Sequence, residues 1–317
     1  MKPRLVPVLA VCVSLAAGSP MAFAQATAWE RADKAAAEAA KMGNLPEAEA
    51  QYTEAVKEAE AFPAIDPRLG KSLIHLGEVQ NAQGKYVPAE STYRRVLSLF
   101  EVKNESQTGD AAVALSGLGA ASLGQGKIQD TEDCYRQAMG IDERTLGMTH
   151  SQVAGDLNNL AQVLILQNKQ DLAEPLLTRA LTIAERTWGP NHPNVASILG
   201  NLGAVHLSQK SFPKAEKEFT RAATIGAQTL GPLHLDTSRY VLGIATSYTR
   251  QNNIAPAEPL FKQVLATREQ VLGPNHPEVA SCLVLYAEML RKAFRKQEAE
   301  QLEARAQSIR AAAGIPQ

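Results

Sequence analysis

Apolar residues recur along this chain at a fixed offset of 42 residues, without an insertion, over most of its 317 residues. One series of large side chains consists of Leu73, Leu115, Leu157, Leu199, Val241 and Leu283. Another series places an acid after a small residue in each unit, at Glu90, Glu132, Glu174, Glu216, Glu258 and Glu300. A constant period of this length predicts a stack of similar units, each of which contacts only its neighbours.

Each unit contains two blocks of apolar residues at helical spacing, separated by a short polar turn. In one unit the blocks are Leu157 to Leu164 and Ala173 to Ala184, with Asn168-Lys169 between them. The second block stops at a glycine, as at Gly189, and a proline that cannot continue a helix follows it. Aromatic residues make up only 5% of the chain, which favours helices over a sheet-based core. The sequence therefore predicts an all-α stack of helical hairpins.

The order of large and small residues resembles the tetratricopeptide repeat. It is seen from Leu73 to Leu76-Gly77 and from Ala89 to Tyr93 and Val96. The 42-residue length and the Gly-Pro-Asn-His-Pro junctions at 189–193 and 273–277 resemble the kinesin-light-chain subtype. This resemblance implies a right-handed superhelical solenoid whose concave face accepts protein or peptide partners.

The repeats divide the chain into three expected regions. The resemblance covers 66–317, which we interpret as six tandem 42-residue repeats. Residues 25–65 resemble a degenerate helical hairpin, with a Gly43-Asn44 turn, that serves as an N-terminal cap. Residues 1–24 differ from all that follows and are interpreted as a secretory signal peptide.

The signal prediction depends on charge, length and small residues. Lys2 and Arg4 precede an apolar stretch that ends at Ala17, too short for a bilayer that needs about 20 residues. The triplet Ala22-Phe23-Ala24 places the cleavage near Ala24, so we expect a periplasmic or secreted protein. A lipoprotein would use Cys12, but Val11 stands before it where a small residue is wanted. No later stretch is apolar enough for an integral membrane span.

Charge and cysteine content limit the kinds of partner and of covalent cross-link that we expect. The 32 basic and 33 acidic residues nearly cancel, so net charge does not indicate nucleic acid. Cleavage of the signal leaves only Cys134 and Cys282, which form no disulfide framework and are interpreted as small buried residues.

Histidines also recur at the 42-residue period, at His150, His192, His234 and His276. Equivalent positions of packed hairpins lie roughly 8–10 Å apart, whereas zinc lies about 2 Å from each ligand, so we predict no metal site. Asp66 and Thr108 occupy the same series, which predicts helix N-caps instead. The chain also lacks phosphate-binding, hydrolase and metalloprotease motifs, so we predict neither a cofactor nor an enzyme.

The candidate binding surface is the side of each first helix that lies opposite its core stripe. By the resemblance, this side lines the concave groove, and asparagines there are similar to those that hold a peptide backbone. Arg239, Arg250 and Arg291 concentrate positive charge toward the C-terminal end, which predicts an anionic partner segment. The candidate groove residues are Asn158, Asn159, Gln162, Asn201, Arg239, Thr246, Arg250, Glu288, Arg291 and Lys292.

The sequence thus predicts a non-catalytic, protein- or peptide-binding scaffold of the cell envelope. Two other hypotheses remain open. One is a self-associating structural component, in which one end of the array stacks on another copy. The other is an accessory binding subunit of an enzyme complex.

Overall fold

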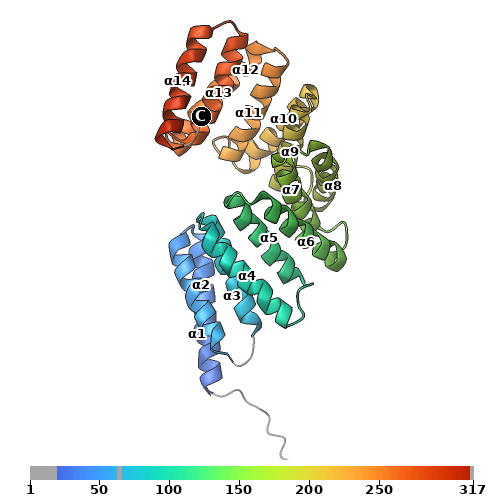
Figure 1. The fold of residues 1–317 in the computed structure, drawn as a ribbon, viewed down its shortest axis with the longest axis vertical. Helices are drawn as coiled ribbons and strands as arrows, with labels where there is room; N and C mark the ends of the chain where they lie inside the picture. Colours follow the sequence, from blue (N-terminus) through green and yellow to red (C-terminus); the bar gives the residue numbers. More distant parts are fainter. Residues whose placement is uncertain (1–19, 63–65, 315–317) are drawn as a thin grey trace, which may run out of the picture. The chain divides into compact units, whose positions relative to one another are not determined.

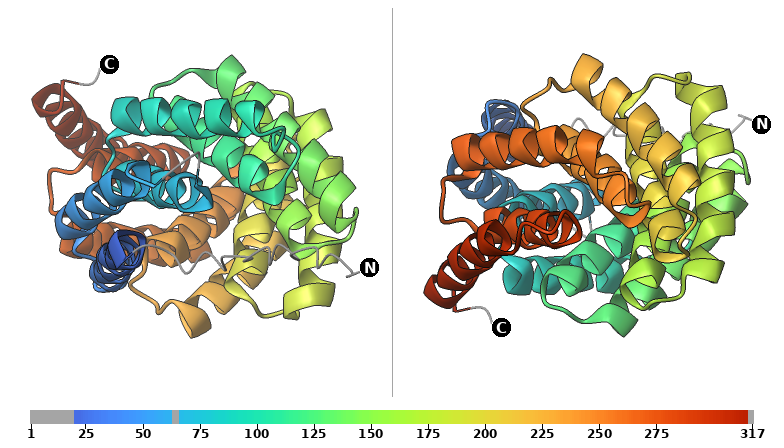
Figure 2. Two further views of the ribbon diagram at one scale, coloured as in Figure 1. Left: turned by 90° about the horizontal axis from the view of Figure 1, so that it is seen from below. Right: turned by 90° about the horizontal axis from the view of Figure 1, so that it is seen from above.

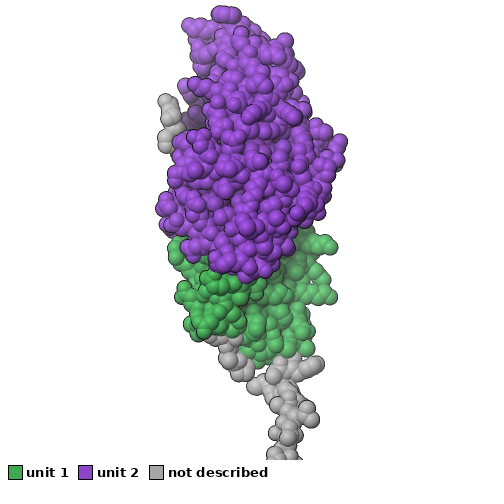
Figure 3. All heavy atoms as spheres, turned by 90° about the vertical axis from the view of Figure 1, so that its right-hand side faces the viewer, with its two compact units in different colours: residues 1–125 green, residues 126–317 purple. Residues whose placement is uncertain are grey.

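The computed structural model describes residues 20–62 and 66–314, which form fourteen α-helices and no strand. These residues belong to two compact units, 1–125 and 126–317 (Figure 3). The first unit contains α1 (Pro20–Lys41), α2 (Leu45–Glu60), α3 (Pro67–Ala82), α4 (Tyr86–Val102) and α5 (Gly109–Gly124). The second contains α6 (Ile128–Leu146), α7 (Ser151–Leu166), α8 (Gln170–Trp188), α9 (Pro193–Ser208), α10 (Phe212–Thr229), α11 (Leu235–Arg250), α12 (Ile254–Leu272), α13 (Pro277–Lys292) and α14 (Lys296–Ala312). Within each unit consecutive helices pack side by side as hairpins (Figures 1 and 2), which confirms the predicted all-α solenoid class.

The residue before each first helix caps it, as the repeat predicted. The carboxylate of Asp66 accepts a hydrogen bond from the backbone N–H of Arg68 at 2.9 Å. The Nδ1 atoms of His150, His192, His234 and His276 each accept one from the backbone two residues later, at 3.2 Å. A capping side chain satisfies an N–H that has no partner within the helix. The periodic histidines are therefore structural.

Within each unit, the core lies between the two helices of a hairpin and between neighbouring hairpins. Leu157, Leu160 and Leu164 of α7 pack with Leu177 of α8 in one buried cluster. The cluster continues into α9, because the period of the repeat places a similar apolar stripe on the next hairpin. No single hairpin could bury this stripe alone.

A ladder of glutamine and glutamate joins successive hairpins. The amide of Gln167, just after α7, donates to Glu132 of α6 at 2.8 Å. Equivalent bonds run from Gln125 to Glu90 at 2.7 Å, from Gln209 to Glu174 at 3.1 Å and from Gln251 to Glu216 at 2.9 Å. In the last hairpin Ala293 stands at the glutamine position, and Arg295 donates to Glu258 at 2.7 Å instead. The periodic glutamates thus bond to the adjoining hairpin, which gives them a structural role.

The first hairpin consists of α1 and α2, and it packs on α3. The indole Nε1 of Trp29 in α1 donates a hydrogen bond to the hydroxyl of Ser72 in α3 at 2.9 Å. Helix α1 begins at Pro20, within the segment interpreted as a signal peptide. Residues 1–19 of that segment, and 63–65 at the end of the expected cap, lie outside the described residues.

The last helix, α14, is polar on most of its surface. Only Ala299, Ala306 and Ile309 are buried among its 17 residues. Glu303 stands where earlier second helices carry Tyr93, Phe219 or Phe261. None of the helices within 20–62 and 66–314 has the length and apolar character that crossing a membrane requires.

Candidate functional site

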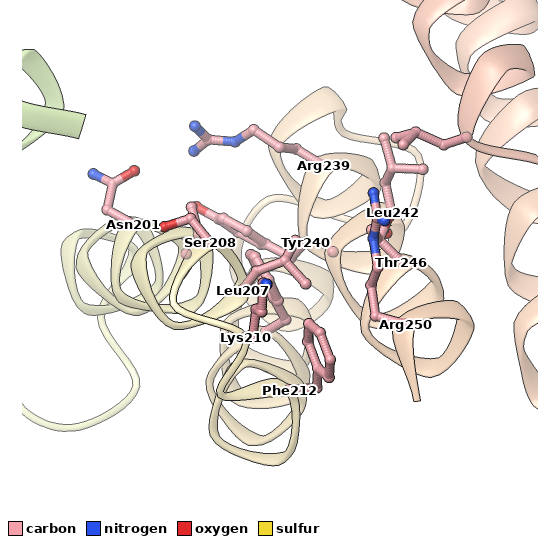
Figure 4. Close-up of a pocket in the computed structure, with 15 residues that line it drawn as sticks. Asn201, Leu207, Ser208, Lys210, Phe212, Arg239, Tyr240, Leu242, Thr246 and Arg250 are labelled. Atoms are coloured by element: carbon pink, nitrogen blue, oxygen red, sulfur yellow. The ribbon is translucent and has the colours of Figure 1, made fainter. Parts of the chain in front are cut away.

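A pocket of about 570 Å³ opens in the second unit between α9, α10 and α11, with one residue of α13 at its border. Figure 4 shows Asn201 and Ser208 on one side of it, and Thr246 and Arg250 on the other. Both sides come from first helices, which were predicted to carry the groove. The lining includes Gly200, Asn201, Ala204, Leu207, Ser208, Lys210, Phe212, Phe219, Arg239, Tyr240, Leu242, Gly243, Thr246, Arg250 and Leu285.

Glycines shape the walls of this pocket. A Cβ atom at Gly200 would lie 2.4 Å from the ring of Tyr240, and one at Gly243 would lie 2.6 Å from the ring of Phe219. These aromatic rings therefore rest directly on the backbone of a neighbouring helix, where no other residue would fit. The result is a hollow with aromatic walls, which is the usual character of a ligand pocket.

Three cations border the pocket, and two of them have a carboxylate partner. Arg239 lies 3.4 Å from Asp236 on its own helix, and Arg250 lies 3.0 Å from Glu288 of α13. Lys210 forms no ion pair with any described residue. The border thus carries more positive than negative charge. All these pairs are exposed, so each is worth about 1 kcal/mol or less and can exchange partners with a ligand.

Lys210 has an unusual backbone for its residue type. Its φ is +60°, in the turn where the other units have Gly84, Gly126, Asn168 and Asn252. Glycine and asparagine tolerate this region, whereas a lysine there is strained by roughly 1 kcal/mol. A strained residue at the border of a pocket points to a role for its side chain.

Two asparagines connect this pocket to a smaller one. The amide of Asn201 donates to the side-chain oxygen of Asn158 in α7 at 2.8 Å. Asn158 and Asn159 line the second pocket, of about 190 Å³, together with Trp188 and Asn194. This bond does not use the NH₂ group of Asn158 or the side-chain oxygen of Asn201. Both groups can form hydrogen bonds with a peptide backbone. The two pockets follow one another along α7, α9 and α11.

The helical wheel overestimated the exposure of this surface. Asn158, Asn201 and Thr246 are less than 10% exposed, because neighbouring first helices pack against one another. The hydroxyl of Thr246 bonds the carbonyl of Leu242 in its own helix. These polar side chains line a recess between helices, whereas the wheel suggested an open face.

The structure brings only part of the predicted cationic group together. Arg291 donates two hydrogen bonds, of 2.8 and 2.6 Å, to Glu303 of α14 and does not line the pocket. Lys292 donates to the carbonyl oxygen of Thr249 at 3.0 Å. Gln162 is half-buried on α7 and lines neither pocket. Position 291 is the repeat equivalent of the buried Thr249, so it turns toward its own hairpin partner.

Sequence reasoning missed the apolar lining. Phe219 belongs to an aromatic series that was interpreted only as core, and Phe212 and Tyr240 were not singled out. Two signals were present in the sequence. Gly200 and Gly243 lie in α9 and α11, the two first helices that form the pocket. Lys210 stands in a turn where other repeats have glycine or asparagine.

An ionic cluster surrounds the buried ring of His206 in α9. The ring of His206 bridges Glu218 of α10, at 2.7 Å, and Glu174 of α8, at 3.2 Å. Burial raises the pKa of Glu218, whereas hydrogen bonds from Gln209 and His206 lower that of Glu174. In the described part of the chain, no three side chains of the metal-binding types are arranged to hold an ion.

Comparison with known proteins agrees with the fold of stacked helical hairpins. A family model described as tetratricopeptide repeat matches residues 110–186, 157–226, 194–270 and 242–312, more than half of the chain. No curated protein is significantly similar to the chain in sequence.

Several solved structures share the fold at low identity. A putative kinesin light chain from Podospora anserina is 20% identical, with a TM-score of 0.53 over 63% of this chain and 95% of its own. A tetratricopeptide repeat protein from Parabacteroides merdae is 16% identical, with a TM-score of 0.60 over 89% of this chain and 93% of its own. A Rap protein complexed with competence and sporulation factor is 15% identical, with a TM-score of 0.64 over 92% of this chain and 77% of its own.

Proposed function

Because the chain belongs to the tetratricopeptide repeat family, we propose that it is a non-catalytic scaffold of the cell envelope that binds a protein or peptide along α7, α9 and α11. Repeats of this family indicate protein–protein interaction, and such proteins are typically binding scaffolds without catalysis. The fold supports this use, since the first helices α7, α9 and α11 line two pockets that follow one another.

The observation that carries the proposal is the pocket at α9–α11. It combines aromatic walls with Lys210, Arg239 and Arg250 at its border. A guanidinium group holds a carboxylate through two parallel hydrogen bonds, and the aromatic wall binds apolar side chains. We infer that the bound segment is anionic and that it contacts Asn158 and Asn201 with its backbone.

The test of the groove is charge reversal at the pocket. A pull-down from envelope extract with the protein as bait identifies the partner, whose affinity is then measured for the double variant Arg239→Glu/Arg250→Glu. We expect binding to weaken by more than tenfold and the remaining binding to depend less on salt, because two attractive charges become repulsive.

The matched control is Lys34→Glu/Lys217→Glu, which changes the net charge equally at exposed positions that do not line the pocket. It should bind as the unmodified protein does. Equal affinities of the two double variants would place the binding site on another surface. Helicity measured by circular dichroism should be the same for all three proteins.

The envelope location rests on the N-terminal sequence, with Lys2, Arg4, the apolar stretch and Ala22-Phe23-Ala24. Cell fractionation and mass determination of the exported protein test it. We expect a protein that begins at Gln25 outside the cytoplasm. A protein that retains its first 24 residues in the cytoplasm would contradict the export proposal.

A further inference from the structure

The turn between α13 and α14 exposes a phenylalanine almost completely. Phe294 is 96% exposed, the largest exposed fraction among the apolar side chains described. Its φ is +61°, at the position where earlier turns have Gly84, Gly126, Asn168, Lys210 and Asn252. A bulky side chain in this backbone region is a true outlier. The chain therefore keeps both strain and apolar exposure at this one turn.

Neighbouring contacts hold the turn in place. The guanidinium of Arg295 donates to Glu258 at 2.7 Å and to Glu298 at 2.6 Å. Lys292 donates to the carbonyl of Thr249 at 3.0 Å and has no carboxylate partner among the described residues. A strained residue persists when such surrounding contacts determine its conformation. Phe294 is thus a preorganised aromatic group, the type that dominates binding at protein interfaces.

Four basic residues surround Phe294 in the sequence and make the turn positively charged. Arg291, Lys292, Arg295 and Lys296 flank it in sequence. Arg291 is paired with Glu303, and Lys296 lies 3.6 Å from Glu300. Lys292 forms no ion pair with a described residue, so an external carboxylate can approach it without competition from another carboxylate. A partner surface should therefore offer an apolar recess with a carboxylate at its edge.

The first unit contains a recess of this type. It measures about 220 Å³ and lies between the start of α3, the end of α4 and the start of α5. Leu99 and Phe100 of α4 form its apolar part, with Asp66, Glu105 and Asp110 at its edge. Asp66 is paired with Arg68 at 3.3 Å and Glu105 with Lys103 at 3.2 Å, but Asp110 forms no ion pair with any described residue.

We propose that Phe294 of one copy docks into this recess on a second copy, so that the protein associates head to tail. An apolar cavity of about 150 Å³ holds benzene, so the recess has room for a phenyl ring. Docking would bring the basic turn to the acidic edge, with Lys292 facing Asp110. The pocket at α9–α11 fits this turn poorly, because its border carries Lys210, Arg239 and Arg250.

Two different surfaces meet in such a contact, so a pair of copies keeps one free Phe294 and one free recess, to which further copies can add. The contact is also small, centred on one aromatic side chain, and interfaces of less than about 1,200 Å² are weak. We expect self-association with a dissociation constant on the order of 100 µM or weaker. This association is independent of the groove and would occur without a peptide partner.

Sedimentation velocity of the purified protein at increasing concentration tests the proposal. The weight-average sedimentation coefficient should rise with concentration. Phe294→Asn should weaken association at least tenfold, and Asp110→Arg should do the same from the other surface. Asparagine tolerates positive φ, so Phe294→Asn should be at least as thermally stable as the unmodified protein. Val87→Asn, at another exposed apolar position, should leave association unchanged.

A mixture of the two variants distinguishes this geometry from others. Phe294→Asn retains the recess and Asp110→Arg retains the aromatic tip, so together they should form a one-to-one dimer that grows no further. Each alone should be monomeric. The proposal is overturned if the unmodified protein stays monomeric up to about 1 mM, if the variants associate as it does, or if the mixture forms no dimer.

Discussion

Two aspartates are buried together at the contact between α6 and α7. Asp142 and Asp156 are 2% and 3% exposed, and their carboxyl groups are hydrogen-bonded to each other. Burial raises the pKa of Asp142, and only in part do this bond and the nearby His150 oppose the rise. Desolvation favours the neutral carboxylic acid, so the folded protein binds a proton here more tightly than the unfolded chain.

The sign of the resulting pH dependence follows from the direction of that shift. Protonated Asp142 contributes stability that is fully present below the ordinary pKa of aspartate and is lost as the pH rises through the raised value. We expect Asp142→Asn to raise the melting temperature at pH 7 and to have a smaller effect at pH 4. Thermal unfolding at both pH values measures this. Asp133→Asn, exposed on the same helix, should show no such difference between the two pH values.

Glycine at position 203 decides how closely two helices approach. A Cβ atom there would lie 2.9 Å from the ring of Phe219 in α10. We expect Gly203→Leu to overpack this contact and to lower the free energy of unfolding by about 1–3 kcal/mol. Chemical denaturation measures the change. Gly155→Ala is the control, since a Cβ atom there meets nothing within 4 Å, and it should stabilise α7 by roughly 0.5–1 kcal/mol. Equal stability of Gly203→Leu and the unmodified protein would contradict the proposed contact.

At the scale of the helix, a residue of a first helix faces the residue 12 positions later in the second helix of the same hairpin. In three hairpins the two residues of this pair are either both polar or both apolar. Gln80 accepts a hydrogen bond from Thr92 at 2.8 Å, and His206 bonds Glu218. In the last hairpin the equivalent residues, Leu290 and Leu302, pack in an apolar cluster. A buried polar group needs a partner, so both members of a pair must be polar or both apolar.

The ladder between hairpins supports a prediction that compares two of its bonds. Burial alone would raise the pKa of Glu132, but hydrogen bonds from Arg136 and Gln167 outweigh it and lower the pKa. Removing the amide with Gln167→Met leaves a nearly buried carboxylate without one donor, which should cost about 1.5–3 kcal/mol. Gln251→Met removes an equivalent bond that is exposed to water, and it should cost less than half as much. Similar losses, measured by denaturation, would show that burial of the carboxylate does not set the strength of the bond.

For the molecule as a whole, stability should decrease from the middle of the second unit toward the last hairpin. The cluster around α7, α8 and α9 contains many fully buried side chains, whereas α14 buries only three of its residues. A solenoid opens locally in units that follow such differences. We expect amide hydrogen exchange of α14 to be much faster than that of α7 at neutral pH. Uniform protection of both helices would indicate one cooperative unit.

The sequence alone determined the class of fold, the hairpin boundaries and the capping role. Each of these depends on contacts that recur at the same position in every repeat, so a 42-residue period reveals them. Leu157 and His192 are examples whose structural role could be inferred from the sequence.

Only the tertiary structure decided which residues form the pocket. Its walls combine residues from α9, α10, α11 and α13, and it exists because two glycines let aromatic rings lie on a neighbouring backbone. Arg291 shows the limit of the pattern, since it was assigned to the groove together with Arg250 but its side chain pairs with Glu303. A helical wheel gives the direction of a side chain from one helix, whereas packing and charge pairing depend on what the next helices place there.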